Sequence, residues 1–217
     1  MSTPIGNLED ITLRALRVLR GVDAVLAEDT RRTRSLLSHY GLRTACVSLH
    51  AHNEHARTDY VVSRLSAGDA LALVSDAGTP GVSDPGAVIV AAVIAAGHPV
   101  TPVPGASALL TALVVSGLPT HSFAFIGFLP PQPSARRKRL QALASSHNGS
   151  TLAFYVPPHK APATLADMAA ILGAHRRCCL GRELTKVYEE LWRGTLGDAA
   201  VEFAERCVLS WRVCLSI

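Results

Sequence analysis

A glycine-containing loop that follows an apolar run is the first candidate for a chemical site. Residues 70–74 are typical of a buried strand, and the loop Ser75-Asp76-Ala77-Gly78-Thr79-Pro80-Gly81 comes directly after them. Glycines at Gly78 and Gly81 would let backbone N–H groups approach a ligand closely. The Asp76 carboxylate suits a ribose hydroxyl or an amine. A turn without a binding role would explain one such loop equally well.

The end of this loop predicts the start of a helix. Asp84 is a good N-cap residue, and Pro85 suits the first helical position. The segment therefore predicts a strand, a tight loop and a helix in that order. In open α/β sheets, ligands bind at such junctions along the carboxyl edge of the strands.

Three further loops are expected at the ends of predicted strands. They are Thr3-Pro4-Ile5-Gly6-Asn7, Glu28-Asp29-Thr30-Arg31 and Pro104-Gly105-Ala106-Ser107-Ala108. Because the carboxyl ends of parallel strands share one edge of a sheet, we expect the four loops to converge. Convergent loops predict a ligand crevice more strongly than any one of them alone.

The elements that position these loops alternate between strand and helix. We expect strands at residues 24–27, 45–49, 70–74, 100–103, 122–126, 151–155 and 177–180, and helices at 9–20, 31–40, 54–65, 85–96, from 106, and 135–144. This alternation predicts an α/β fold with a mostly parallel N-terminal sheet. The composition shifts near residues 117–119. We therefore expect an α/β domain over residues 1–110 and a mixed-sheet α/β domain over 111–217.

Composition and charge limit the class of protein. The chain has 217 residues, of which 48% are hydrophobic, and a net charge of +4, which favours an anionic partner. The longest apolar run, residues 87–96, is too short to span a bilayer. The five cysteines form no CxxC pair, which favours a reduced, cytoplasmic protein without a disulfide framework. An organelle is the alternative if a targeting segment precedes Met1.

Two side-chain clusters outside the loops carry weaker signals. The run Arg136-Arg137-Lys138-Arg139 could grip RNA phosphates, although such runs are usually solvated helix faces. His50, His52 and His55 lie close in sequence, but no cysteine or acidic cluster completes a four-ligand set. We therefore expect no metal site.

Taken together, the loops resemble the ribosomal RNA small-subunit methyltransferase I family of the tetrapyrrole methylase superfamily. The resemblance runs from about Thr3 to about Ala200. The matching segments are Thr3-Pro4-Ile5-Gly6-Asn7-Leu8, Ala27-Glu28-Asp29-Thr30-Arg31, His52-Asn53-Glu54, Val74-Ser75-Asp76-Ala77-Gly78-Thr79-Pro80, Asp84-Pro85-Gly86, Pro104-Gly105, Gly117-Leu118-Pro119, Gly127-Phe128-Leu129-Pro130 and Arg182-Glu183-Leu184-Thr185-Lys186. The order and spacing of nine motifs make the resemblance specific.

The resemblance implies a two-domain, S-adenosylmethionine-dependent methyltransferase that works as a homodimer, with the cofactor in a cleft between its domains. It implies that the methyl acceptor is the ribose 2′-hydroxyl of a cytidine in small-subunit ribosomal RNA, either free or in the assembled subunit. No membrane and no metal are expected. A C-methyltransferase acting on a tetrapyrrole, and a truncated, inactive relative that only binds the ribosome, remain open as alternatives.

The resemblance also implies roles for particular residues. We expect cofactor contacts from Asp76, Ala77, Gly78, Thr79, Pro80, Asp84, Pro104, Gly105, Ala106, Ser107, Ala108, Gly127 and Phe128. We expect substrate contacts from Gly6, Asn7, Arg31, Arg136 and Arg137. Asp29, Glu54 and Lys186 are the candidates for a base that takes the hydroxyl proton, and the sequence does not rank them.

The chain departs from the family pattern at both ends. The family has a short hydrophobic strand directly before the Thr3–Asn7 motif, where this chain has Met1-Ser2. The tail, residues 207–217, does not match the family's glycine-rich turn and final apolar strand. We expect these departures to lower stability relative to the family's members.

Overall fold

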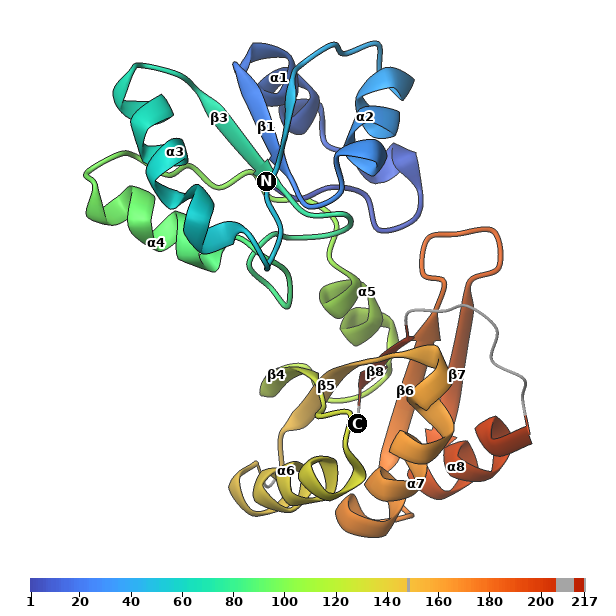
Figure 1. Cartoon of the computed structure of the whole chain (residues 1–217). Helices are drawn as coiled ribbons and strands as arrows, with labels where there is room; N and C mark the ends of the chain where they lie inside the picture. The colour runs from blue at the N-terminus through green and yellow to red at the C-terminus, as the bar shows by residue number, and fades with distance from the viewer. Residues whose placement is uncertain (148, 206–212, 217) are drawn as a thin grey trace. The chain divides into compact units, whose positions relative to one another are not determined.

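The computed structural model describes residues 1–147, 149–205 and 213–216. The chain divides into two compact units, Met1–Ser107 and Ala108–Ile217, and each is an α/β structure (Figure 1). None of the helices in the described residues is long and apolar enough to cross a membrane.

The N-terminal unit is built on a three-stranded parallel sheet in the order β2-β1-β3. The strands are β1 (Ala24–Ala27), β2 (Cys46–Ser48) and β3 (Leu71–Val74). The first helices are the 3₁₀ helix η1 (Leu8–Asp10), α1 (Leu13–Gly21) and α2 (Thr30–His39), followed by α3 (Glu54–Ser66) and α4 (Ala87–Ala95). The sequence predicted the three strands to within two residues at each end.

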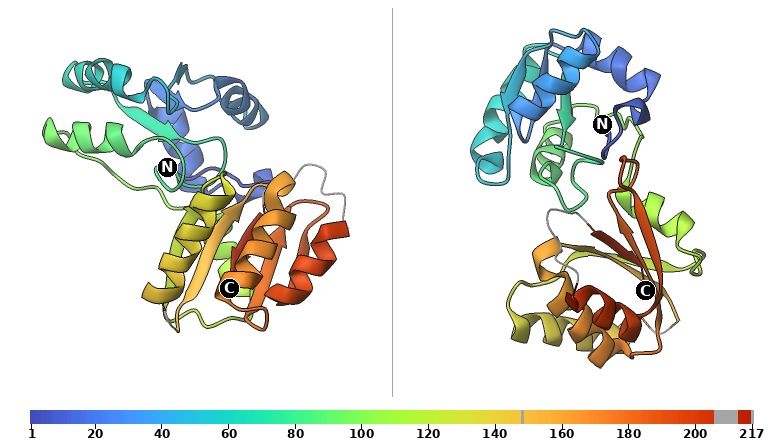
Figure 2. Two further views of the ribbon diagram at one scale, coloured as in Figure 1. Left: turned by 60° about the horizontal axis from the view of Figure 1, so that its bottom comes forward. Right: turned by 90° about the vertical axis from the view of Figure 1, so that its right-hand side faces the viewer.

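Alternating side chains of β1 separate two cores in this unit. Val25 and Ala27 pack with Leu19 of α1 and Leu37 of α2 on one face. Leu26 packs on the other face, in the cluster that includes residues of α3 and α4. Helices α1 and α2 therefore cover one face of the sheet, and α3 and α4 cover the other (Figure 2).

The C-terminal unit holds a five-stranded mixed sheet in the order β4-β5-β8-β6-β7. The strands are β4 (Phe123–Phe128), β5 (Thr151–Val156), β6 (Arg177–Arg182), β7 (Glu190–Thr195) and β8 (Val213–Ser216). Strands β4 and β5 are parallel, and β8 pairs antiparallel with both β5 and β6. The tail thus supplies a central strand, although its sequence does not match the family's ending.

Helices line this second sheet. They are α5 (Ala108–Val115), α6 (Pro133–Ser146), the 3₁₀ helix η2 (Pro158–Lys160), α7 (Ala161–Leu172) and α8 (Leu196–Glu205). Leu140 of α6, Leu165 of α7 and Phe203 of α8 share one core with Phe154 of β5. Figure 2 shows these three helices side by side over one face of the sheet.

Three local predictions were wrong. The helix expected over residues 9–20 is divided into η1 and α1, and α1 begins only at Leu13. The segment 100–103 forms no strand; the Ser2 N–H donates to the Val103 carbonyl at 3.0 Å, but no ladder continues from there. Helix α4 begins at Ala87 rather than at Pro85, and its N-cap is Gly86, with φ of 131°, rather than Asp84. The donors at this helix start are satisfied by a side chain distant in sequence, which the local pattern did not reveal.

Candidate functional site

Three loops of the N-terminal unit meet around Ser2 and Thr3. The Thr3 N–H donates to the Gly78 carbonyl at 2.9 Å, and the Gly78 N–H donates back to the Thr3 carbonyl at 3.1 Å. The Ser2 hydroxyl lies 2.8 Å from that of Thr79. Since Ser2 also bonds to Val103, it joins the loop after β3 to the segment that leads into Pro104.

Glycines permit this close contact. A Cβ atom on Gly105 would lie 3.1 Å from the Ser2 Cβ, which is tighter than ordinary packing. Gly78 has φ of +82°, a conformation that side-chain-bearing residues rarely adopt, and a Cβ there would lie 3.6 Å from Ile5 Cγ2. The structure therefore brings together the predicted cofactor loops at 76–80 and 104–106. Ser2 and Ile5 complete the junction. Ile5 lies in the predicted loop 3–7, whereas sequence reasoning did not single out Ser2.

The Asp76 carboxylate bridges the carboxyl ends of two adjacent strands. Its Oδ1 accepts a hydrogen bond from the Asp29 N–H at 2.9 Å, and its Oδ2 lies 3.4 Å from Arg32 Nη1. Because β1 and β3 are neighbours, the loops that follow them can make this contact. A carboxylate has about four acceptor sites, so Asp76 retains capacity for a ligand hydroxyl. The sequence reasoning missed Arg32, although it follows Arg31 at the start of α2.

Asp29 is the N-cap of α2 and places a negative charge at the start of this helix. Its side chain accepts from the Arg31 N–H at 2.8 Å and pairs with the Arg31 guanidinium at 2.7 Å. These hydrogen bonds hold the pKa of Asp29 well below its usual range. A carboxylate with a lowered pKa accepts a proton poorly, so the structure weakens the case for Asp29 as the base.

Glu54 reaches from the first residue of α3 to the start of α4. The side chain is buried, with 7% of the residue exposed. Its Oε1 accepts hydrogen bonds from the N–H groups of Gly86 at 2.8 Å, Val88 at 3.0 Å and Ile89 at 3.3 Å. Glu54 therefore supplies the acceptor that Asp84 was predicted to supply. A carboxylate committed to three donors is better suited to fixing the preceding loop than to accepting a proton.

The third candidate base lies on a strained loop in the C-terminal unit. After β6, Glu183 has φ of 50° and Thr185 has φ of 67°, values that are rare for residues other than glycine. The Thr185 hydroxyl oxygen is buried and has no hydrogen-bond partner in the described residues. Lys186 Nζ donates to Glu183 Oε1 at 2.8 Å. Strain of this kind is concentrated at functional sites.

The basic run on α6 is not uniform. Arg136 is 5% exposed, and its guanidinium pairs with the Asp167 carboxylate of α7 at 2.6 Å. This buried ion pair leaves Arg136 unavailable to an RNA phosphate, which corrects the expectation that all four residues contact RNA. Arg137, Lys138 and Arg139 are exposed.

The remaining predicted contacts lie in both units. Gly6 and Asn7 are exposed beside η1, and the Asn7 side chain accepts from the Glu9 N–H at 3.0 Å. Gly127, with φ of 72°, lies at an irregularity of β4, and the Phe128 ring is 5.5 Å from the Tyr155 ring. In the described residues, no group of three or more His, Cys, Asp or Glu side chains could hold a metal ion.

Comparison with known proteins defines the class. The family model for Tetrapyrrole (Corrin/Porphyrin) Methylases matches residues 2–200. A solved structure titled uroporphyrin-III C-methyl transferase from Thermus thermophilus, complexed with S-adenyl homocysteine, aligns with a TM-score of 0.65 at 19% identity. The alignment covers 97% of this chain and 92% of that chain. The chain belongs to the tetrapyrrole methylases and has their α/β fold.

Curated relatives narrow the assignment within this class. A ribosomal RNA small subunit methyltransferase I from Xylella fastidiosa is 50% identical over 94% of this chain and 74% of its own length. One from Halalkalibacterium halodurans is 48% identical over 100% of this chain and 74% of its own length. Within the tetrapyrrole methylases, the chain is a member of the ribosomal RNA small subunit methyltransferase I family.

Proposed function

We propose that this protein transfers a methyl group from S-adenosylmethionine to the ribose 2′-hydroxyl of a cytidine in 16S-type ribosomal RNA. The observation that carries the proposal is the 50% identity, over 94% of the chain, to a protein named for methylation of small-subunit ribosomal RNA. A second relative of the same name, 48% identical, aligns over 100% of this chain, so that alignment spans every loop of the candidate site. The basic character of the chain, with a net charge of +4, is consistent with an RNA substrate.

The loops that meet at Ser2 and Thr3 fit a nucleoside cofactor. Asp76 has acceptor capacity for ribose hydroxyls, and Gly78 leaves its backbone uncovered by a side chain. Pro104 and Gly105 are exposed beside them. We propose that residues 76–80, Asp84 and residues 104–108 hold the cofactor, with Gly127 and Phe128 contributing from the C-terminal unit. The predicted cleft between domains 1–110 and 111–217 stays a prediction.

Bound S-adenosylmethionine supplies a methyl group already activated by a sulfonium. In the proposed transfer, the ribose oxygen would bond to the methyl carbon as the carbon–sulfur bond breaks, and a base would take the hydroxyl proton. All three candidate bases already have partners within the protein. Asp29 pairs with Arg31, Glu54 accepts hydrogen bonds from the start of α4, and Lys186 pairs with Glu183. We therefore propose that positioning supplies most of the catalysis. Lys186 is the first residue to test in proton transfer because its loop is strained.

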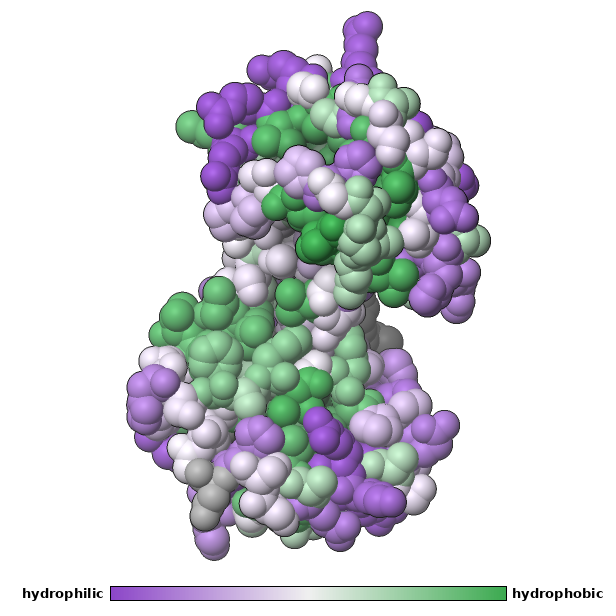
Figure 3. All heavy atoms as spheres, turned by 90° about the vertical axis from the view of Figure 1, so that its left-hand side faces the viewer, coloured by the Kyte–Doolittle hydropathy of each residue, from purple (hydrophilic) through white to green (hydrophobic). Residues whose placement is uncertain are grey.

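The proposed partners of the chain are its RNA substrate and a second copy of itself. We propose that Gly6, Asn7, Arg31 and Arg137 contact the RNA, and that the protein acts in the cytoplasm as a homodimer. Apolar surface gathers on one face of the C-terminal unit (Figure 3). Exposed apolar residues of this unit include Leu110, Val114, Phe123 and Phe128. Such residues support a surface that a second copy would cover.

C-methylation of a tetrapyrrole is the second candidate, because the fold also occurs in uroporphyrin-III C-methyl transferase. The 19% identity to that protein shows the fold alone, whereas the rRNA methyltransferase relatives reach 50%. The third candidate is a relative that binds the ribosome without turnover.

One assay separates the three candidates. The purified chain is incubated with S-adenosylmethionine labelled in its methyl group, and with either unmethylated small ribosomal subunits or uroporphyrinogen. We expect label in the RNA and none in the tetrapyrrole. Label in the tetrapyrrole would support the second candidate. Binding of cofactor and subunits without any transfer would support the third.

A further inference from the structure

Charge is segregated within the N-terminal unit. The first 107 residues contain nine arginines and ten acidic residues, so their composition is close to neutral. Yet α1 and α2 together hold six arginines and no acidic residue. Helix α3, on the opposite face of the sheet, mixes Glu54 and Asp59 with Arg57 and Arg64. The clustering on α1 and α2 is therefore a local feature and does not reflect an overall basic composition.

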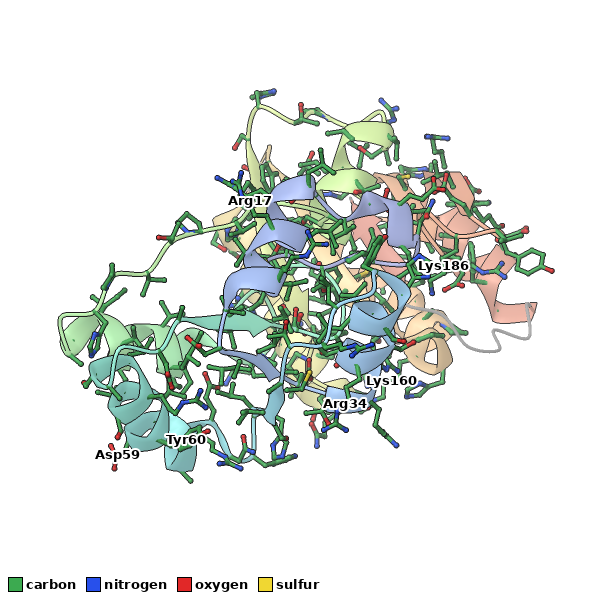
Figure 4. The ribbon with its side chains drawn as sticks, turned by 90° about the horizontal axis from the view of Figure 1, so that it is seen from above. Arg17, Arg34, Asp59, Tyr60, Lys160 and Lys186 are labelled. Carbon is green, nitrogen blue, oxygen red and sulfur yellow. The ribbon has the colours of Figure 1, made fainter. Side chains whose placement is uncertain are left out.

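The packing of α1 and α2 turns these arginines away from the core. Ala15 and Leu19 of α1, and Thr33 and Leu37 of α2, are the buried side chains of the two helices. The arginines at the other helix positions are exposed: Arg14, Arg17, Arg20, Arg31, Arg32 and Arg34. Figure 4 labels Arg17 on α1 and Arg34 on α2.

Two of the six arginines have acidic partners. Arg31 pairs with Asp29 and Arg32 with Asp76, at the edge that carries the candidate cofactor loops. In the described part of the chain, no ion pair forms to Arg14, Arg17, Arg20 or Arg34. Four uncompensated arginines on two adjacent helices create a positive potential that an anionic partner would neutralise.

We propose that the outer face of α1 and α2, defined by Arg14, Arg17, Arg20 and Arg34, binds the phosphate backbone of the RNA substrate. This inference rests on the proposed function and adds a docking surface to it. Arginine presents a planar fork of N–H donors that matches phosphate oxygens in a bidentate manner. Because Arg31 and Arg32 begin the same helix as Arg34, the surface is continuous with the loop edge where Asp76 lies.

The chemistry favours RNA over a protein partner. Protein interfaces have an apolar centre, and Leu13 is the one large apolar side chain that is strongly exposed on α1 and α2, at 86%. Helices α1 and α2 contain no Phe, Tyr or Trp, and arginines alone are suited to a sequence-independent backbone contact. Such a surface would orient the RNA, while the loops select the ribose.

The test is the salt dependence of RNA binding by the full chain. Arg14→Gln, Arg17→Gln and Arg20→Gln are combined, and affinity for protein-free 16S ribosomal RNA is measured by filter binding between low and moderate salt. Each phosphate contact contributes roughly 0.7 to the slope of log affinity against log salt, so loss of all three should lower the slope by about 2. Arg17→Gln alone should lower it by about 0.7. Glutamine keeps the helix propensity and much of the side-chain length.

A charge-matched control lies on the other face of the sheet. Arg57→Gln on α3 removes the same charge as Arg17→Gln, and we expect it to leave the slope unchanged. Equal slopes for the triple variant and the wild-type chain would overturn the inference. So would unchanged binding to RNA with weakened binding to intact subunits, which would assign the face to a ribosomal protein. The slope requires no methyl transfer, so RNA bound through this face without methylation would contradict the proposed function alone.

Discussion

Glu54 Oε1 accepts a hydrogen bond from the Gly86 N–H at 2.8 Å, which joins the first residue of α3 to the cap of α4. Gly86 can take φ of 131° there because it has no side chain, and a Cβ at this position would lie 2.8 Å from Leu73 Cδ2. The loop between β3 and α4 is thereby held at both ends. The loop begins directly after β3, and at its end the Gly86 N–H is bonded to the buried Glu54 carboxylate.

Replacing Glu54 with alanine should destabilise the protein and loosen this loop. Three N–H donors lose a charged acceptor, so we expect a loss of about 2 kcal/mol in the free energy of unfolding. For a chain of this size, that corresponds to a fall in Tm of roughly 4–8 °C. Calorimetry should also show weaker binding of S-adenosylmethionine. Asp59→Ala, an exposed position on the same helix, is the control and should change neither quantity. Equal behaviour of the two variants would show that the Glu54 contact is unimportant.

The ion pair between Arg136 and Asp167 makes a different prediction for the two parts of the basic run. Arg136→Ala leaves Asp167 without its buried partner and should cost about 3 kcal/mol in unfolding free energy. Arg139→Ala, which removes the same charge from an exposed position, should cost no more than about 0.5 kcal/mol. Denaturant unfolding measures both. If Arg139→Ala were the more damaging variant, the assignment of Arg136 to the core of the C-terminal unit would be wrong.

Gly78→Val should weaken cofactor binding beyond its effect on folding. Gly78 has φ of +82° and lies against Ile5, within the junction of the candidate cofactor loops. Gly41, at the end of α2, has φ of +64° with nothing within 4 Å of an added Cβ. Gly41→Val therefore imposes a similar backbone strain, about 1–2 kcal/mol, away from the loops. We expect calorimetry to show at least a roughly tenfold loss of affinity, about 1.4 kcal/mol, for Gly78→Val alone. Unchanged affinity in a folded Gly78→Val protein would argue against this placement.

The buried cysteines should resist alkylation in the folded state. Burial raises the pKa of the Cys178 thiol to about 12 and raises that of Cys179 above its usual value. A raised pKa lowers the thiolate fraction at pH 8, and the thiolate is the reactive form. Burial also raises the pKa of Cys46, but its thiol is only half-buried, so iodoacetamide labelling mapped by mass spectrometry should modify Cys46 before Cys178. After unfolding in guanidinium, the rates should converge. Rapid labelling of native Cys178 would contradict its position in the core.

Local patterns predicted the elements whose ends are marked in the sequence. Residues 24–27 were predicted exactly as β1, because an apolar run ends at two acidic residues. The segment 100–103 differs in that it contains Pro102, which has no N–H to donate to a neighbouring strand, and it forms no strand. The elements α7, β7, α8 and β8 were not predicted, because no loop motif drew attention to the segments that form them.

Site contacts between loops that follow neighbouring parallel strands could be predicted from the expected sheet. Contacts between distant residues that no such strand pairing brings together could not. The contact of Asp76 with Asp29 follows from the neighbouring parallel strands β1 and β3. Residues 104–106 follow no strand, and they meet residues 76–80 through Ser2, which bonds to both Val103 and Thr79. The contact of Glu54 with Gly86 joins residues 32 apart, and no local signal identifies it. Arg136 did leave a signal, because it shares a helix face with buried Leu140 and Leu143 at spacings of four and seven residues.

The most direct test of the proposed function is the chemical identity of the methylated nucleoside. Unmethylated small ribosomal subunits are incubated with the chain and S-adenosylmethionine, and the RNA is digested to nucleosides and analysed by mass spectrometry. We predict 2′-O-methylcytidine, approaching one methyl group per subunit, and its absence when cofactor is omitted. A methyl group on a base, on the ribose of another nucleoside, or on no nucleoside at all would contradict the proposed function.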